Sequence, residues 1–270
     1  MKKFIDLEHI SSKIRLSALE ESVRARRGHL GGTYSCVEIL VYLYYGSVLQ
    51  VDPKNPNWSD RDRFILGKGH ACLALYPILV DLGFMPAERL QTYGKNGGLG
   101  TQLDYTIPGV DWNTGSLGHA LGVCAGIALS AKLENKLFSA YAVLGDAECE
   151  EGAIWETITF AGEKKLNNLI GIIDRNRLSA TETLDDDSFF KNYTVSLNAL
   201  GWECFEVDGH SFNELSSGFK RANKSKIPTM IICNTIKGKG VRFMENKIKW
   251  HHSLPTKREY DLAVKELKRR

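Results

Sequence analysis

The sequence predicts an α/β fold, a doubly wound and mainly parallel sheet with helices on both faces. Short apolar runs that stop on polar residues alternate with helical segments along the chain, which is the order of strands and crossover helices in such a sheet. The clearest example joins apolar runs at 141–144 and 169–173 through a helical segment. A chain of 270 residues can also bury a full core, so we expect one domain over residues 1–270.

Composition and charge narrow the class of protein. Hydrophobic residues make up 43% of the chain and charged residues 25%, which is typical of a globular domain. A net charge of +3 is too small to argue for a nucleic-acid partner. The N-terminus lacks the apolar core of a signal peptide and no apolar run reaches membrane-spanning length, so we expect a cytoplasmic protein without a membrane. The six cysteines form no C-x-x-C pair and read as buried thiols.

The first part of the chain predicts two helices joined by a loop. Apolar residues at helical spacing over 7–18 indicate an opening helix, which Gly28 ends. The segment 29–32 contains one histidine between glycines and reads as a loop. Ser35 and Glu38 then have the spacing of a capping box that starts the next helix.

The middle of the chain predicts a strand and two further helices. The run 60–66 reads as a strand and stops in the glycine-rich turn 67–70. Helical segments follow at 71–82 and 120–133, and the second of these is rich in alanine and glycine. Small residues on that helix favour close packing against a neighbour.

The last third of the chain predicts the remaining strands. A helical segment at 195–200 precedes an alternating strand at 202–207. The residues 211–214 read as the capped start of another helix. The final strand is expected at 228–235.

Two polar residues at strand ends point to a metal site. Asp146 follows the apolar run at 141–144, and Asn176 follows the run at 169–173. Open parallel sheets bind ligands beyond the carboxyl ends of their strands, so these side chains are expected to converge there. Carboxylate, amide and carbonyl oxygens are hard ligands and suit Mg²⁺.

The same residues carry a resemblance to a known family. Gly145-Asp146, followed thirty positions later by Asn176, is similar to the thiamine diphosphate motif. The resemblance implies that Asp146, Asn176 and the carbonyl of Leu178 hold the metal, Mg²⁺ or else Ca²⁺ or Mn²⁺, which bridges the cofactor's diphosphate. Ala147 stands where the motif has its second glycine, and its methyl group fits there if φ is negative.

Further motifs resemble those of transketolases over residues 7–262. The resemblance implies that His29, His70 and His251 face the cofactor and substrate, and that they orient hydroxyls and move protons with near-neutral pKa values. It also implies that Glu151 lies near the cofactor and bridges two active sites through a dimer contact. The residues implied in cofactor binding are His70, Gly115, Ser116, Leu117, Asp146, Ala147, Glu148, Asn176, Leu178 and His251.

Three positions depart from the family pattern. Gln102 stands where transketolases have an active-site histidine, and it can neither take up a proton nor carry charge. This change favours a specialised sugar pathway over the common pentose phosphates. His119 replaces a glutamine, and His252 follows His251 where the family has Trp-His-Gly. Adjacent histidines are not expected to chelate one metal together.

The resemblance implies an enzyme made of two kinds of chain. In the family, the glutamate that activates the cofactor lies in a second, pyrimidine-binding domain, which a third, C-terminal domain follows, and this chain matches only the first. We therefore expect the N-terminal subunit of a split transketolase, active with a C-terminal subunit in an α2β2 heterotetramer. It would pass a two-carbon ketol unit from a ketose to an aldose.

Two other functions are compatible with the same residues. One is a different thiamine diphosphate enzyme, such as a 2-oxo acid decarboxylating subunit or a deoxyxylulose-phosphate-type synthase. Gln102 and Ala147 leave this open, whereas His29, His70 and His251 favour a transketolase. The other is a non-catalytic scaffold, which the presence of the predicted metal ligands disfavours.

Overall fold

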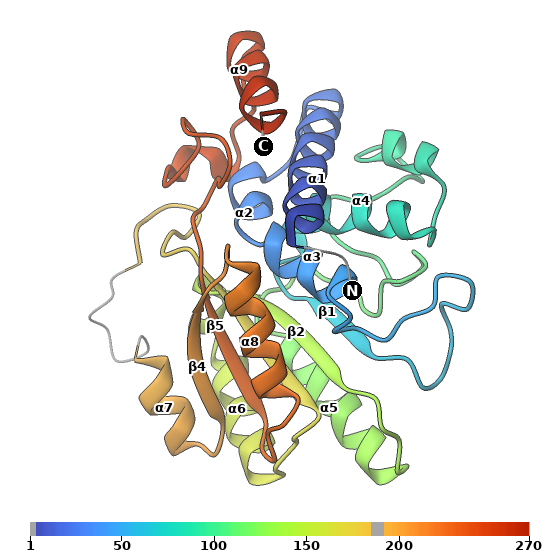
Figure 1. Cartoon of the computed structure of the whole chain (residues 1–270), viewed down its shortest axis with the longest axis vertical. Helices are drawn as coiled ribbons and strands as arrows, with labels where there is room; N and C mark the ends of the chain where they lie inside the picture. Colours follow the sequence, from blue (N-terminus) through green and yellow to red (C-terminus); the bar gives the residue numbers. More distant parts are fainter. Residues whose placement is uncertain (1–3, 185–191, 270) are drawn as a thin grey trace.

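A single parallel sheet forms the centre of the protein (Figure 1). The computed structural model describes residues 4–184 and 192–269, so the polar loop expected at 179–187 is described only as far as 184. Within the described residues the sheet has five strands, in the order β1-β2-β3-β5-β4, and every neighbouring pair is parallel. The strands are β1 Arg63–Leu66, β2 Ala140–Gly145, β3 Leu169–Arg175, β4 Glu203–Asp208 and β5 Thr229–Asn234.

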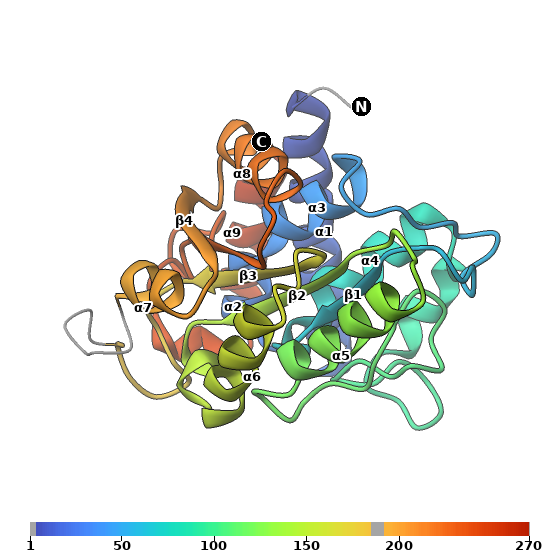
Figure 2. The ribbon, with the colours of Figure 1, turned by 90° about the horizontal axis from the view of Figure 1, so that it is seen from below.

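Helices cover both faces of this sheet, as the sequence predicts. Figure 2 shows α5, α6 and α7 on one side of the strands and α1, α3 and α8 on the other. The α-helices are α1 Phe4–Ala25, α2 Leu30–Ser35, α3 Val37–Tyr45, α4 Cys72–Leu82, α5 Ala120–Leu133, α6 Gly152–Glu163, α7 Tyr193–Ala199, α8 Phe212–Ala222 and α9 Lys257–Leu267. No helix in the described part of the chain combines the length and apolar character needed to cross a membrane.

The two faces of the strands belong to separate hydrophobic clusters. Tyr141 and Val143 of β2 pack with α1, α3, α4 and α8, while Ala142 and Leu144 pack with α5, α6 and α7. Successive side chains of a strand point to opposite faces, so a strand buried on both sides must be apolar throughout. This requirement explains the uninterrupted apolar runs of the sequence. All six cysteines are buried and free, as expected.

The segment after Gly28 is the main departure from the predicted elements. The sequence predicts a loop at 29–32, but helix α2 begins at Leu30. Its glycines allow close contacts, because a Cβ on Gly32 would lie 3.3 Å from Nε2 of His70. A Cβ on Gly31 would lie 3.1 Å from the side chain of Lys237. Tertiary packing therefore outweighs the weak helix propensity of glycine.

The capping box predicted for α3 does not form. Residue Cys36 is the N-cap of α3 and makes no side-chain capping bond. The hydroxyl of Ser35 donates instead to Asp174, at 2.6 Å. The carboxylate of Glu38 accepts hydrogen bonds from Arg15, at 2.6 and 2.7 Å. Both side chains therefore bind distant elements that the local pattern could not reveal.

Candidate active site

Asp146 and Asn176 meet beyond the ends of β2 and β3. The pairing of Gly145 with Asp174 aligns the ends of the two strands, so the residues that follow lie side by side. Asp146 is 4% exposed and accepts hydrogen bonds from the backbone N–H groups of Ala147 and Arg177, at 2.9 and 2.5 Å. The Asn176 amide oxygen accepts one from Leu178. The structure thus brings the two predicted side chains together at the expected edge of the sheet.

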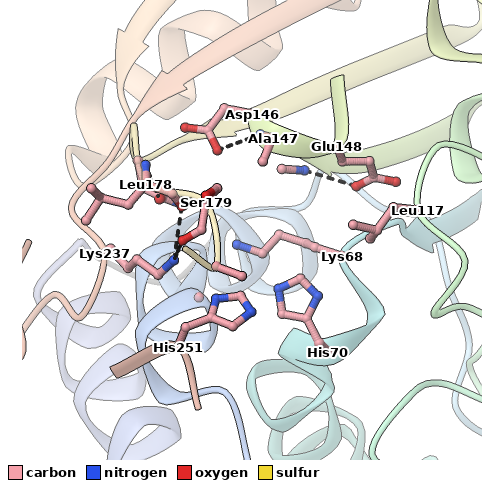
Figure 3. Close-up of a pocket in the computed structure, with 14 residues that line it drawn as sticks. Lys68, His70, Leu117, Asp146, Ala147, Glu148, Leu178, Ser179, Lys237 and His251 are labelled. Carbon is pink, nitrogen blue, oxygen red and sulfur yellow. Dashed lines mark hydrogen bonds between the residues drawn. The ribbon is translucent and has the colours of Figure 1, made fainter. Parts of the chain in front are cut away.

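These side chains line a cavity of about 140 Å³ (Figure 3). That volume is well below the ~300–1,000 Å³ of sites that enclose a whole small-molecule ligand. The walls supplied by this chain therefore surround only part of a cofactor. The predicted site residues that line the cavity are His70, Leu117, Asp146, Ala147, Glu148, Asn176, Leu178 and His251.

The donor set in the cavity fits a hard divalent cation. Asp146, Asn176 and Leu178 offer a carboxylate, an amide and a carbonyl oxygen, the types of ligand that Mg²⁺ takes in proteins. Burial, followed by the nearby charge of Asp174, raises the pKa of Asp146 to about 6. A divalent cation beside Asp146 would favour its charged form and remove this penalty.

Two buried lysines in the site have no counterpart in the predictions. Lys237 is 2% exposed and its ammonium group donates to the carbonyl oxygens of Leu178 and Ser179, at 3.0 and 2.6 Å (Figure 3). Burial, followed by the charge of Lys68, lowers the pKa of Lys237 to about 8. Lys237 therefore places positive charge beside the predicted metal ligands.

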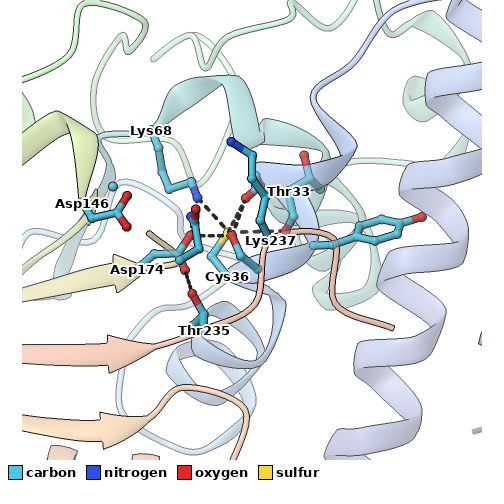
Figure 4. Close-up of polar contacts among 12 residues, drawn as sticks. Thr33, Cys36, Lys68, Asp146, Asp174, Thr235 and Lys237 are labelled. Atoms are coloured by element: carbon cyan, nitrogen blue, oxygen red, sulfur yellow. Dashed lines mark hydrogen bonds and ion pairs between the residues drawn. The ribbon is translucent and has the colours of Figure 1, made fainter. Parts of the chain in front are cut away.

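Lys68 forms an ion pair with Asp174 under the cavity floor (Figure 4). The pair is buried, with Lys68 2% and Asp174 0% exposed. Ser35 and Thr235 also donate to the Asp174 carboxylate, which joins α2 and the end of β5 to β3. Both lysines follow strands of the sheet, so the rule that identified Asp146 could also have found them.

Four histidine rings lie together on the side of the cavity facing away from Asp146. The ring of His29, at the N-cap of α2, lies 5.2 Å from that of His70 and 5.3 Å from that of His251, measured between centroids. His70 and His251 line the cavity opposite the Asp146 carboxylate (Figure 3). The exposed ring of His252 lies 4.7 Å from that of His29 and 4.6 Å from that of His251.

The rings of His29, His70 and His251 are neutral at pH 7, which differs from the expected near-neutral pKa values. Burial, then the charges of His252 and Lys237, lowers the pKa of His29 to about 4. Burial, then Lys237, lowers the pKa of His251 to about 3. Burial and Lys68 lower the pKa of His70 well below its usual value. Neutral imidazoles can orient hydroxyl groups, and each offers one donor and one acceptor.

Ala147 and Glu148 occupy a 3₁₀ turn, Ala147–Glu150, that closes one end of the cavity. Ala147 is not among the described non-glycine residues with positive φ, so its methyl group fits. The Glu148 carboxylate accepts hydrogen bonds from the backbone N–H groups of Gly118 and Gly145, both at 3.1 Å. Burial raises the pKa of Glu148 to about 7. Its carboxylate therefore fixes two loops of the cavity wall.

Other predicted residues lie outside the cavity. Gly115 and Ser116 are exposed, and neither lines the cavity. Glu151 is exposed at the N-cap of α6, where it is accessible to a second chain. Gln102 packs against Gly69, and its Oε1 atom is buried without a hydrogen bond among the described residues. The roles predicted for the first three stay predictions.

Comparisons with known proteins agree with this geometry. Residues 7–268 match the family described as transketolase, thiamine diphosphate binding domain. One of the subunits of the apulose-4-phosphate transketolase of Phocaeicola vulgatus is 37% identical over 266 residues, which cover 98% of this chain and 94% of that protein. The 6-deoxy-6-sulfo-D-fructose transketolase subunit SqwG of Clostridium sp. is 36% identical, over 98% of this chain and 97% of its own length.

Single-chain transketolases are longer. Rat transketolase is 34% identical over 98% of this chain, which spans 42% of the rat protein. The transketolase structure from Campylobacter jejuni superimposes with a TM-score of 0.93 and 28% identity, over 99% of this chain and 43% of that one. The resemblance seen in the motifs is thereby confirmed. This chain belongs to the transketolase family and corresponds to its thiamine diphosphate-binding domain.

Proposed function

We propose that this chain is the thiamine diphosphate-binding subunit of a two-chain transketolase, which transfers a two-carbon ketol unit from a ketose to an aldose. One observation carries the proposal. Oxygen donors from the ends of β2 and β3 line the same cavity as His70 and His251, with His29 beside them. This combination provides a site for a metal-bound diphosphate on one side and hydroxyl-binding groups on the other.

The oxygen donors and Lys237 bind the cofactor's charged end. Asp146, Asn176 and the carbonyl of Leu178 hold Mg²⁺, and the metal in turn holds the diphosphate. When bound, thiamine diphosphate supplies the carbon nucleophile that attacks the donor ketose. The ammonium group of Lys237 lines the same cavity, so it adds a positive charge close to the phosphate oxygens.

The histidines position the sugar. His29 and His251 each have a buried Nδ1 atom without a hydrogen bond among the described residues. A substrate hydroxyl that binds there would satisfy these atoms, and a substrate without that hydroxyl would leave them unpaired. Neutral rings can donate to or accept from the hydroxyl without adding charge. His70 acts in the same way from the turn between β1 and α4.

A second chain completes the site. The small cavity leaves part of the cofactor outside the walls of this chain, and the two relatives of similar length are both named as subunits of transketolases. We infer a partner that carries the pyrimidine-binding and C-terminal domains, in an α2β2 assembly. Glu151, exposed at the start of α6, is placed at that contact. The six free, buried thiols suit a reducing compartment such as the cytoplasm.

The donor sugar belongs to a specialised pathway. The two relatives are named for apulose 4-phosphate and for 6-deoxy-6-sulfo-D-fructose, which are both ketoses with an anionic group. Gln102 supports a departure from the common pentose phosphates, because its free Oε1 lies beside the turn that carries His70. We propose an anionic ketose as the donor.

Co-expression with the pyrimidine-binding chain from the same genome tests this function. The purified complex should bind thiamine diphosphate with Mg²⁺ and release an aldose from an anionic ketose, which a coupled assay detects. The Asp146→Asn complex, matched for assembly by gel filtration, should be inactive. Turnover of 2-oxo acids but not of ketoses would assign another thiamine diphosphate reaction. An assembled complex that binds no cofactor would identify a scaffold.

A further inference from the structure

Three histidines at the edge of the cavity have the arrangement of metal ligands. His29, His251 and His252 each offer a ring nitrogen, and these nitrogens all lie within 4.8 Å of one another. The ring centroids are 4.6 to 5.3 Å apart. His251 and His252 are adjacent in the chain, but the bend of η5, Ile248–His251, ends between them and turns both rings toward His29.

This spacing needs only a small adjustment to bind an ion. Zn²⁺ takes imidazole nitrogens at ~2.0–2.1 Å with tetrahedral angles, which places neighbouring nitrogens about 3.4 Å apart. Rotation of the exposed His252 ring about its side-chain torsions brings its nitrogen closer to those of His29 and His251 at little cost. A three-histidine set of this kind leaves one position open for water.

The nitrogens are also available. Nδ1 of His29 and Nδ1 of His251 are buried and make no hydrogen bond among the described residues. Both rings are neutral at pH 7, the form in which imidazole binds metals. One cation opposes binding, since Lys237 acts electrostatically on both rings. Its ammonium protons, however, are directed to the carbonyls of Leu178 and Ser179.

The histidine cluster differs chemically from the oxygen site across the cavity. Imidazole ligands select Zn²⁺, Cu²⁺ or Ni²⁺, whereas the carboxylate, amide and carbonyl around Asp146 suit Mg²⁺. Excess Mg²⁺ therefore saturates the oxygen site and leaves the imidazoles free. The two sites can be examined separately in one sample.

We propose that His29, His251 and His252 form a binding site for a transition-metal ion such as Zn²⁺ at the edge of the cavity, and that the bound ion inhibits the enzyme. Inhibition follows because the ion engages His29 and His251, which the proposed function assigns to substrate hydroxyls. That second clause rests on the proposed function, whereas the metal site itself does not.

Calorimetry on the full, untagged chain in excess Mg²⁺ tests the site directly. Titration with Zn²⁺ should give one ion per chain, and Co²⁺ should give the absorption bands of a tetrahedral nitrogen site. His252→Gly, which restores the glycine of the family motif, should weaken binding by about 100-fold. His9→Ala removes an exposed histidine of α1 and should leave binding unchanged.

Three results would overturn the metal site. One is the lack of saturable Zn²⁺ binding, and another is equal binding by His252→Gly. The third is an intense near-ultraviolet band with Co²⁺, because this band would assign the ion to cysteine thiolates. Circular dichroism establishes that the variant is folded. If it is not, His29→Asn provides the same comparison from α2.

Turnover of the two-chain complex tests inhibition separately. Zn²⁺ should lower the rate, a chelator should restore it, and the His252→Gly complex should need about 100-fold more Zn²⁺ for the same loss. Stoichiometric Zn²⁺ binding without loss of activity would overturn the inhibitory clause. A complex without ketose turnover would contradict the proposed function, while the calorimetric result for the metal site would still stand.

Discussion

The ammonium nitrogen of Lys237 lies 3.0 Å from the carbonyl oxygen of Leu178, the backbone group predicted to bind the metal. It also donates to the carbonyl of Ser179, at 2.6 Å. The fold thus directs a lysine toward an oxygen that Mg²⁺ would use. The metal and the ammonium group must either share this carbonyl or move apart when the cofactor binds.

Replacing Lys237 by methionine should change two affinities in opposite directions. Mg²⁺ alone should bind several-fold more tightly, because a competing cation is lost. Thiamine diphosphate with Mg²⁺ should bind about tenfold more weakly, because a charge-assisted hydrogen bond to phosphate is lost. Calorimetry measures both affinities. The control is Lys239→Met, since Lys239 lines a different pocket with Glu38 and His210. A shift of both affinities in the same direction would contradict this account.

The variant Asp146→Asn should lose cofactor binding while it keeps its fold. Removal of the one charged ligand should weaken binding of thiamine diphosphate with Mg²⁺ by about 100-fold. Without ligand, its free energy of unfolding should stay within about 1 kcal/mol of wild type, since loss of one N–H acceptor offsets relief from a buried charge. Denaturation with and without cofactor measures both effects. A metal-free variant that is largely unfolded would assign Asp146 a structural role instead.

The buried pair of Lys68 and Asp174 should be costly to break. Burial alone would lower the pKa of Lys68, but Asp174 outweighs it and raises that pKa. Lys68→Met leaves a fully buried carboxylate without its cation and should lower the free energy of unfolding by about 3–5 kcal/mol. Urea denaturation measures this loss.

An exposed ion pair provides the matched control for Lys68→Met. Lys136 pairs with Asp60 at the surface, where their side chains are 36% and 48% exposed. Lys136→Met should have a far smaller effect, because solvent screens that pair. The double variant Lys68→Met/Asp174→Leu should recover part of the loss. Equal losses for the two lysine variants would refute the argument from burial.

The Arg15–Glu38–His210 cluster should make stability depend on pH. Burial alone would raise the pKa of Glu38, but Arg15 and then His210 outweigh it and hold that pKa below its ordinary value of 4.5. A lowered pKa in the folded state means that the stabilisation is present above pH 4.5 and is lost as pH falls toward the folded pKa. His210 in turn accepts a hydrogen bond from the N–H of Ile236, next to Lys237.

Glu38→Gln should therefore lower the free energy of unfolding by about 3 kcal/mol at pH 7, because Arg15 becomes a buried, unpaired charge. The difference from wild type should shrink as pH falls below 4.5. Denaturation at pH 7 and pH 3.5 measures this trend. Glu163→Gln, at an exposed position of α6, serves as the control. A difference that is constant with pH would show that the carboxylate charge is not the cause.

Local patterns sufficed for elements whose environment is uniform along the chain. β2 and β3 are buried on both faces, so their apolar runs were continuous and their ends clear. The helix predicted at 120–133 matches α5. Helix α2 was missed, because its glycines are poor helix formers and the helix depends on contacts with His70 and Lys237.

The sequence by itself determined the parallel sheet and the meeting of Asp146 with Asn176, since chain direction and strand ends alone decide which loops share an edge. The tertiary structure decided what surrounds them. Lys68, Lys237 and the ring of His252 come from distant segments, and no local spacing relates them to the cavity. Their charges and pKa values follow from burial and from neighbours that folding alone brings within a few ångströms.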